Sequence, residues 1–241
     1  MQYNEYVSRK AWKPGEPLQH WVSKRIMKEI INVTDLEVAV CDVLEIGCGT
    51  GTLARQIVER GFHSYSAFEP NSMLASITRE GVSEARVFEV GLPNIPKGIE
   101  SSFDLIICVH VIEHARNGYE AREWIASLKP LLRENGKLVI ISPEISEYKG
   151  YFWEIDWSHC FPTSKENLKQ IALDLEYKIE FSRSFKLGST KRIATFLGST
   201  FSLLIPTKVL NLLGNYFIGR PLGTGLKAAL LWGATFVVIR K

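Results

Sequence analysis

The chain has 241 residues, of which 46% are hydrophobic and 23% are charged, and its formal net charge is +3. This composition provides enough apolar residues for a sizeable core, and it excludes a disordered chain, a collagen-like repeat and a disulfide-rich miniprotein. The four cysteines form no C-x-x-C pair and no zinc-ligand spacing, so we expect reduced thiols in a cytoplasmic protein. The polar residues 1–10 lack the apolar core of a signal peptide.

Charge is unevenly distributed along the chain. Residues 181–241 contain nine Lys or Arg and no Asp or Glu, whereas residues 1–180 carry a net charge of −6. This asymmetry favours an anionic surface or ligand near the C-terminal quarter.

Apolar periodicity predicts alternating helices and strands. A helix is expected over 18–31, and we assign residues 1–40 to an N-terminal helical lid. Asn135-Gly136 is expected to turn the chain into the fifth strand, and Thr163 to Glu166 match a capping box. The alternation predicts an α/β fold with helices on both faces of the sheet. Strands are expected at 41–47, 64–69, 86–90, 103–109, 137–143, 177–185 and 234–240, with helices at 52–61, 71–79, 119–133 and 163–175.

Residues 187–232 interrupt this alternation. Their longest charge-free apolar stretch, 193–207, has 15 residues, whereas a membrane-spanning helix needs about 20. Val209, Leu213 and Tyr216 recur at helical spacing beside basic residues. We therefore expect an amphipathic helical insertion that is either a cap or a membrane-surface element, inserted into a main domain of residues 41–186 and 233–241.

The sharpest motif runs from Glu45 to Gly51, in the order Glu-Ile-Gly-Cys-Gly-Thr-Gly, where a strand meets a helix. Glycines there permit a tight turn and let a ligand approach the backbone amides. Glu69 ends the next strand, where a carboxylate can bind a ribose diol. A nicotinamide dinucleotide requires glycine where Thr52 stands, and Glu45 would repel its pyrophosphate. The pattern therefore favours a ligand with a positive amine or sulfonium, S-adenosylmethionine.

Three segments in combination, VLEIGCGTG, AFEP and FDLIICVHVIEH, closely resemble the class I S-adenosylmethionine-dependent methyltransferases. LKPLLRENGKLVIISP is similar to the helix, turn and strand that follow in that family. The subgroup is similar to the ubiquinone-pathway O-methyltransferases and to methyltransferases of surface-polysaccharide synthesis. The resemblance covers residues 42–185 and the last strand. It implies a Rossmann-like, seven-stranded, mostly parallel sheet with an antiparallel last strand.

The resemblance also implies a cofactor site for S-adenosylmethionine. The glycine loop would lie under the methionine and ribose, Glu69 would bind the ribose hydroxyls, and Leu92 would form an apolar wall where the family often has an Asp. The cofactor-binding residues carried over by position are Glu45, Gly47, Cys48, Gly49, Gly51, Glu69, Pro70, Leu92, Val109 and His110.

The run from His110 to His114 has the H-x-x-E-H spacing of some zinc proteases. That chemistry requires both histidines on one helix face, whereas here they follow a buried strand, so proteolysis is not expected. In the ubiquinone-pathway relatives an acidic residue usually stands at the position of His110, and a nearby cluster has been linked to a divalent cation. Because this chain has a histidine there, we expect no metal.

Transfer of a methyl group to oxygen depends on positioning and can need a base to take the acceptor's proton. Histidine is the usual base near neutral pH. We choose His159 first and His114 second as catalytic residues. The aromatic residues around His159, in YFWEIDWSHCFP, indicate either an acceptor pocket or an ordinary core patch.

We therefore predict an enzyme, a methyltransferase that uses S-adenosylmethionine and methylates a small or lipid-linked acceptor at oxygen. A non-catalytic S-adenosylmethionine-binding module and a nucleic-acid methyltransferase remain alternatives. No stable nucleic-acid partner is expected, because no RNA-binding module is visible. A peripheral contact of residues 187–232 with the inner face of a membrane is compatible with their basic, apolar composition.

Overall fold

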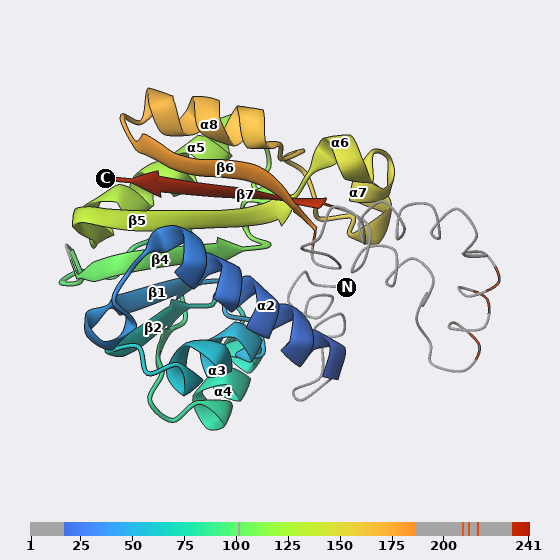
Figure 1. Cartoon of the computed structure of the whole chain (residues 1–241). Helices are drawn as coiled ribbons and strands as arrows, with labels where there is room; N and C mark the ends of the chain where they lie inside the picture. The colour runs from blue at the N-terminus through green and yellow to red at the C-terminus, as the bar shows by residue number, and fades with distance from the viewer. Residues whose placement is uncertain (1–16, 101, 187–208, 210–211, 213–215, 217–232) are drawn as a thin grey trace.

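The computed structural model describes residues 17–100, 102–186 and 233–241, together with Val209, Leu212 and Tyr216 (Figure 1). Most of the predicted insertion at 187–232, and residues 1–16 of the predicted lid, therefore lie outside the described residues.

Seven strands form one sheet in the order β3-β2-β1-β4-β5-β7-β6 (Figure 1). The strands β1 to β5 pair in parallel, whereas β7 runs antiparallel to both β5 and β6. The predicted mostly parallel sheet with an antiparallel last strand is confirmed. The strands are β1 Asp42–Ile46, β2 Ser64–Phe68, β3 Arg86–Phe88, β4 Phe103–Val109, β5 Leu132–Pro143, β6 Lys178–Lys186 and β7 Gly233–Arg240.

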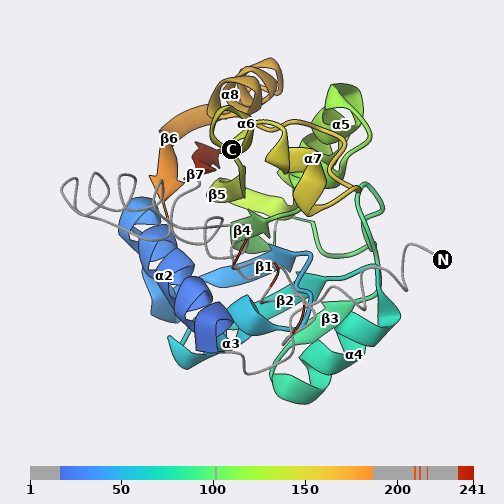
Figure 2. The ribbon, with the colours of Figure 1, turned by 90° about the vertical axis from the view of Figure 1, so that its right-hand side faces the viewer.

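Helices cover both faces of the sheet (Figure 2). On one face, α5 and α8 pack on alternate strand residues such as Ile106 and Ile140; on the other, α2 and α3 pack on Leu105 and Val139. Each face therefore has its own core. The helices are α2 Pro17–Thr34, α3 Thr52–Glu59, α4 Ser72–Gly81, α5 Gly118–Leu128, α6 Ile145–Tyr148, α7 Tyr151–Ile155 and α8 Lys165–Asp174, with short 3₁₀ turns η1 Val38–Val40, η2 Ile112–His114 and η3 Lys129–Leu131.

The predicted helix over 119–133 is wrong at its C-terminal end. The helix α5 ends at Leu128, and Pro130 lies in the 3₁₀ turn that follows, because proline lacks the N–H that would continue the helix. The strand β5 then begins at Leu132 and includes the expected turn at Asn135-Gly136, which forms an irregularity in its pairing with β4. A Cβ at Gly136 would lie 3.0 Å from the Phe103 carbonyl oxygen, so the two strands approach closely here.

The capping box of α8 is shifted by one residue from its predicted place. Ser164 is the N-cap, and it exchanges hydrogen bonds with Asn167 instead of pairing Thr163 with Glu166. The Thr163 hydroxyl instead donates to the Pro143 carbonyl oxygen at 2.6 Å. The Thr163 side chain therefore binds the end of β5 and does not cap α8.

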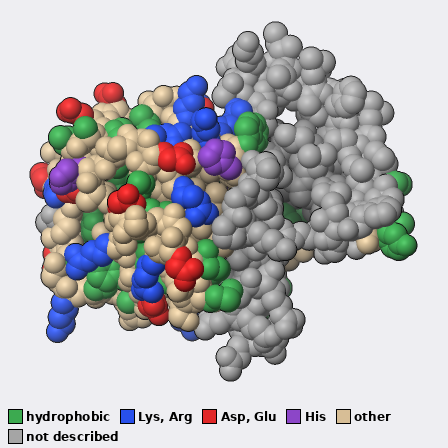
Figure 3. All heavy atoms as spheres, turned by 90° about the horizontal axis from the view of Figure 1, so that it is seen from below, with side chains coloured by type: hydrophobic (Ala, Val, Ile, Leu, Met, Phe, Trp, Pro, Cys, Tyr) green, Lys and Arg blue, Asp and Glu red, His purple; other side chains and the backbone are tan. Residues whose placement is uncertain are grey.

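The helix predicted at 18–31 is present as α2, and its C-terminal half belongs to the core. Ile26, Met27 and Ile30 are buried beside α3. No helix among the described residues is long and apolar enough to cross a membrane. On the face seen from below, the acidic and basic side chains of the described residues are interspersed and do not form a patch of one sign (Figure 3).

Candidate cofactor and acceptor site

The loop between β1 and α3 depends on three glycines in left-handed conformation. Gly47 has φ +73° and donates its N–H to the Phe68 carbonyl oxygen, and a Cβ there would lie 2.9 Å from Cγ2 of Val111. Gly51 has φ +72° and precedes α3. Gly49 has φ +56°, and no heavy atom of the described residues lies within 4 Å of its Cβ position. Packing thus requires glycine at 47, whereas the open side of Gly49 leaves room for a ligand.

Glu69, which directly follows β2, is hydrogen-bonded to the glycine loop. Its Oε2 accepts the Gly49 N–H at 2.9 Å, and its Oε1 accepts the Asn71 N–H at 2.9 Å. Burial raises the pKa of Glu69, although the two backbone hydrogen bonds oppose that shift. A carboxylate oxygen can accept two hydrogen bonds, so one position on each oxygen remains for the hydroxyls of a ribose.

Glu45 lies in β1 beneath the loop and is only 4% exposed. The Tyr65 hydroxyl donates to its Oε2 at 2.6 Å. Burial raises the pKa of Glu45 to about 8, against the lowering effect of the Tyr65 hydrogen bond. The site therefore holds a second carboxyl group whose charge a cationic ligand would stabilise.

The other residues predicted to bind the cofactor come from neighbouring strand ends. A Cβ on Gly91 would lie 3.2 Å from Cβ of Pro70, so the segments after β2 and β3 are in contact near Leu92. The Cys48 thiol is buried 3.6 Å from the Thr78 hydroxyl, which donates to the Gly49 carbonyl oxygen. Because β1, β2 and β3 run parallel, the loops that follow them all lie at the edge of the sheet formed by the carboxyl ends of these strands.

Val109 ends β4 at the same edge of the sheet, and His110 directly follows it. The backbone of His110 is left-handed, with φ +57°, and its N–H donates to the Ile141 carbonyl oxygen. Its Nδ1 lies 3.0 Å from Oε1 of Glu113, and its side chain is about half exposed. Burial disfavours the Glu113 carboxylate, but the His110 hydrogen bond and the charges of three histidines outweigh it and lower the pKa of Glu113 to about 2.

His114 and His159 lie side by side, with their ring centroids 5.0 Å apart. His159 is 7% exposed, and its Nδ1 donates to the Phe152 carbonyl oxygen at 2.7 Å. Burial lowers the pKa of His159. His114 Nδ1 lies 3.0 Å from the Ser158 hydroxyl, which donates to Asp156. One ligand atom from each of Glu113, His114 and His159 lies within 4.8 Å of the others.

The aromatic segment around His159 divides between core and surface. Phe152 and Phe161 are buried, and the Phe152 ring lies 4.9 Å from that of His159. Tyr151, Trp153 and Trp157 are about half exposed or more. The core interpretation thus applies to Phe152 and Phe161, and the acceptor pocket stays a prediction.

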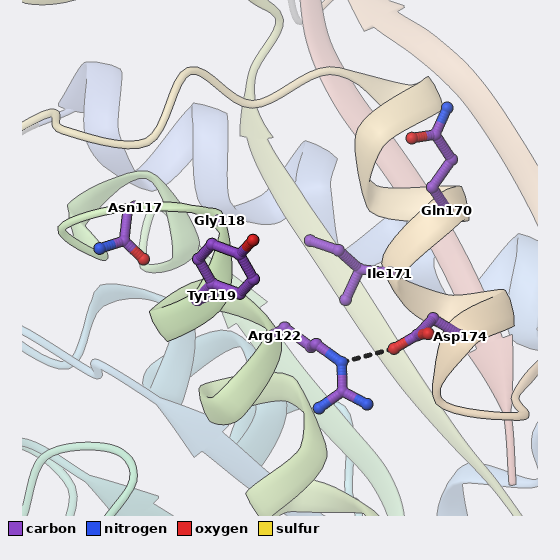
Figure 4. A pocket seen from close by; sticks show the side chains of 7 residues that line it. All are labelled: Asn117, Gly118, Tyr119, Arg122, Gln170, Ile171 and Asp174. Atoms are coloured by element: carbon purple, nitrogen blue, oxygen red, sulfur yellow. Dashed lines mark hydrogen bonds and ion pairs between the residues drawn. The ribbon is translucent and has the colours of Figure 1, made fainter.

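A groove of about 530 Å³ lies elsewhere, between α5 and α8 (Figure 4). It is lined by Tyr119, Gln170 and Ile171, among others, and Arg122 forms an ion pair with Asp174 across it. None of the predicted site residues lines this groove. We place the candidate site at the glycine loop, because Glu69 binds the Gly49 amide there and Glu45 is buried beneath it.

Several functional neighbours have no local sequence signal. Tyr65 and Thr78 contact Glu45 and the glycine loop from β2 and α4, and Ser142 donates to Oε2 of Glu113 from β5. Asp104, near the start of β4, lies at the opposite edge of the sheet, where it pairs with Arg133.

The sequence matches the methyltransferase domain family model over residues 18–180. It is 25% identical over 159 residues to a ubiquinone biosynthesis O-methyltransferase of Rickettsia typhi, covering 63% of this chain and 62% of that protein. It is 29% identical over 108 residues to an uncharacterized methyltransferase of Alkaliphilus oremlandii, covering 44% and 48%. The chain spans about half to three fifths of the length of the curated relatives it matches.

Solved structures share the fold at low sequence identity. A SAM-dependent methyltransferase from Archaeoglobus fulgidus has a TM-score of 0.64 at 17% identity, with 100% of both chains covered. The [4+2]-cyclase SpnF has a TM-score of 0.61 at 17% identity, with 90% of this chain and 80% of that chain covered. Because the family model spans more than half of the sequence, the chain belongs to the methyltransferase domain family.

Proposed function

We propose that this protein is an enzyme that binds S-adenosylmethionine at the glycine loop and transfers its methyl group to an acceptor oxygen. The observation that carries the proposal is the pairing of an open Gly49 with two buried carboxyl groups, Glu45 and Glu69. Carboxylates in a site of low polarity attract the positive amino and sulfonium groups of this cofactor and would repel a pyrophosphate. The family supports methyl transfer, and the O-methyltransferases among the relatives support oxygen as the methylated atom.

Calorimetry with S-adenosylhomocysteine tests the cofactor assignment. We expect binding of this product and no binding of NAD. Glu69→Ala should weaken binding by about 1–3 kcal/mol, because it removes charge-assisted hydrogen bonds to the ribose and to Gly49. An unchanged affinity would refute the role of Glu69.

We propose His159, with His114 as the second choice, as the group that takes the proton from the acceptor. As the acceptor oxygen bonds to the methyl carbon, the carbon–sulfur bond breaks and the hydroxyl proton passes to an imidazole Nε2. In His159 the Nδ1–H donates to the Phe152 carbonyl oxygen, and burial, which lowers the pKa of the ring, favours its neutral form. His159→Ala should reduce turnover by roughly a hundredfold with S-adenosylhomocysteine affinity retained. Loss of turnover in His114→Ala alone would exchange the two assignments.

For the acceptor we propose a small or lipid-linked molecule, reached from the cytoplasmic face of a membrane. Trp153 and Trp157, in the segment that leads to His159, are exposed, and the described residues Val209, Leu212 and Tyr216 are all more than half exposed. Apolar side chains at helical spacing beside basic residues favour an interfacial helix. Flotation with anionic vesicles tests this. Binding should fade with added salt and disappear when Lys191, Arg192 and Lys208 are replaced by Ser, and a wild-type chain that ignores the vesicles would favour a soluble acceptor.

A binding module without turnover is the competing function. The [4+2]-cyclase with the same fold illustrates that the fold by itself does not specify methyl transfer. Mass spectrometry of candidate acceptors incubated with S-adenosylmethionine separates the two. A product heavier by one methyl group supports the enzyme, whereas cofactor binding with no product from any acceptor class supports the module.

A further inference from the structure

We propose that Glu113, His114 and His159 together bind one divalent transition-metal ion of the zinc, cobalt and iron(II) class. The three side chains come from the turn after β4 and from the segment after α7, and a ligand atom of each lies within 4.8 Å of the others. The motif comparison gave no reason to expect a metal, because His110 replaces an acidic residue. In the structure the third donor is not His110 but His159, which lies outside that motif.

The hydrogen bonds of the two histidines leave the same ring nitrogen available in each. A carbonyl oxygen only accepts, so Nδ1 of His159 carries the hydrogen that is bound to Phe152. The Ser158 hydroxyl directs its one hydrogen to Asp156, so it accepts from Nδ1 of His114. Each neutral ring therefore has its lone pair on Nε2. A metal-binding histidine characteristically donates its other ring N–H to a carbonyl or a carboxylate-linked group.

The carboxylate is fixed in a comparable way. Glu113 is fully buried, His110 occupies one lone pair of Oε1, and Ser142 donates to Oε2 at 2.7 Å. Each oxygen retains one further lone pair for an ion. The backbone carbonyl oxygen of Glu113 also accepts the N–H groups of Cys160 and Phe161, which fixes the His159 segment beside it.

The donor set decides the class of ion. Two imidazoles and one carboxylate suit zinc and neighbouring transition metals, whereas magnesium and calcium prefer oxygen ligands. Tetrahedral ligands about 2.1 Å from an ion lie roughly 3.4 Å apart, so donor atoms that are at most 4.8 Å apart would approach one another by up to about 1.4 Å on binding. If the proposed methyl transfer is correct, the ion would lower the pKa of an acceptor hydroxyl bound to it. Proton transfer from the acceptor directly to Nε2 of His159 would then describe only the metal-free protein.

Cobalt binding tests the site without reference to activity. The full chain, freed of any purification tag and of metal, is titrated with Co²⁺, and visible absorption and elemental analysis are measured after gel filtration. We expect one ion per chain and the visible bands of nitrogen-ligated cobalt, which a large excess of Mg²⁺ does not remove. His159→Ala and His114→Ala should each weaken binding by at least about a hundredfold. Ser158→Ala, which frees His114 Nδ1, should weaken it by about 10–100-fold.

His63→Ala is the matched control, because His63 is an exposed histidine that pairs with Asp42 at the opposite edge of the sheet. It should bind Co²⁺ like the wild type. Less than one ion in the wild type, or an unchanged spectrum in His159→Ala, would overturn the metal site. Binding of S-adenosylhomocysteine and methylated product are measured separately. Their absence in a protein that binds Co²⁺ would count against the proposed function alone.

Discussion

Replacement of Glu45 by Gln should change the stability of the protein and its affinity for the cofactor in opposite directions at high pH. The Glu45 carboxyl is buried in β1, and burial raises its pKa from 4.5 to about 8. Glutamine keeps an oxygen to accept the Tyr65 hydroxyl but never carries charge. We therefore expect Glu45→Gln to be more stable than the wild type at high pH and to bind the cofactor more weakly.

The raised pKa fixes the sign and the size of the effect. The folded chain holds this proton more tightly than the unfolded chain, so the stabilisation is complete below pH 4.5 and is lost as the pH rises to about 8. The resulting loss in wild-type stability is about 1 kcal/mol at pH 5 and about 4 kcal/mol at pH 8. The buried amide hydrogens of Gln add a cost of about 1–3 kcal/mol that does not vary with pH. The free-energy difference between the two proteins should therefore change by about 3 kcal/mol over this range.

Urea unfolding of both proteins at pH 5, 7 and 8 measures this change. Glu84→Gln, at an exposed position, is the matched control. Calorimetry with S-adenosylhomocysteine at pH 7 measures the accompanying loss of affinity. A stability difference that is the same at pH 5 and pH 8 would show that Glu45 is ionised with an ordinary pKa, and the electrostatic reasoning about the loop would then be wrong.

Three further predictions follow from the same geometry. Affinity for S-adenosylmethionine should rise between pH 6 and pH 8, because a bound cation favours the ionised form of Glu45, and calorimetry across this range measures it. Gly47→Ala should destabilise the fold by about 1–3 kcal/mol in urea because its Cβ would meet Val111, whereas Gly49→Ala, with open space around it, should lose cofactor affinity at a backbone cost of about 1–2 kcal/mol. Arg133→Ala removes half-exposed ion pairs to Asp42 and Asp104 at the far edge of the sheet, so it should cost under about 1 kcal/mol and leave cofactor affinity unchanged.

The sequence by itself determined the seven strands, the longer helices between them and the place of the glycine loop. These features are local. The alternation and length of apolar runs indicate which strands are buried. Glu45, Gly47 and Gly51 lie within seven consecutive residues at a strand-to-helix junction. Their backbone conformations follow from residue type, since a left-handed turn favours glycine. The combination of motifs also sufficed to indicate the family.

The tertiary structure decided which of these residues meet, and what each side chain binds. Asp104 lies near the start of β4, at the edge of the sheet away from the loop, whereas Glu69 directly follows β2 and accepts the Gly49 N–H. His159 reaches Glu113 because the segment after α7 folds back onto the turn after β4. Such contacts join residues far apart in the sequence and leave no periodic pattern. Hydrogen-bond partners such as Phe152 and Ser158 then fix which nitrogen of each imidazole is available, which is a property of packing and not of residue type.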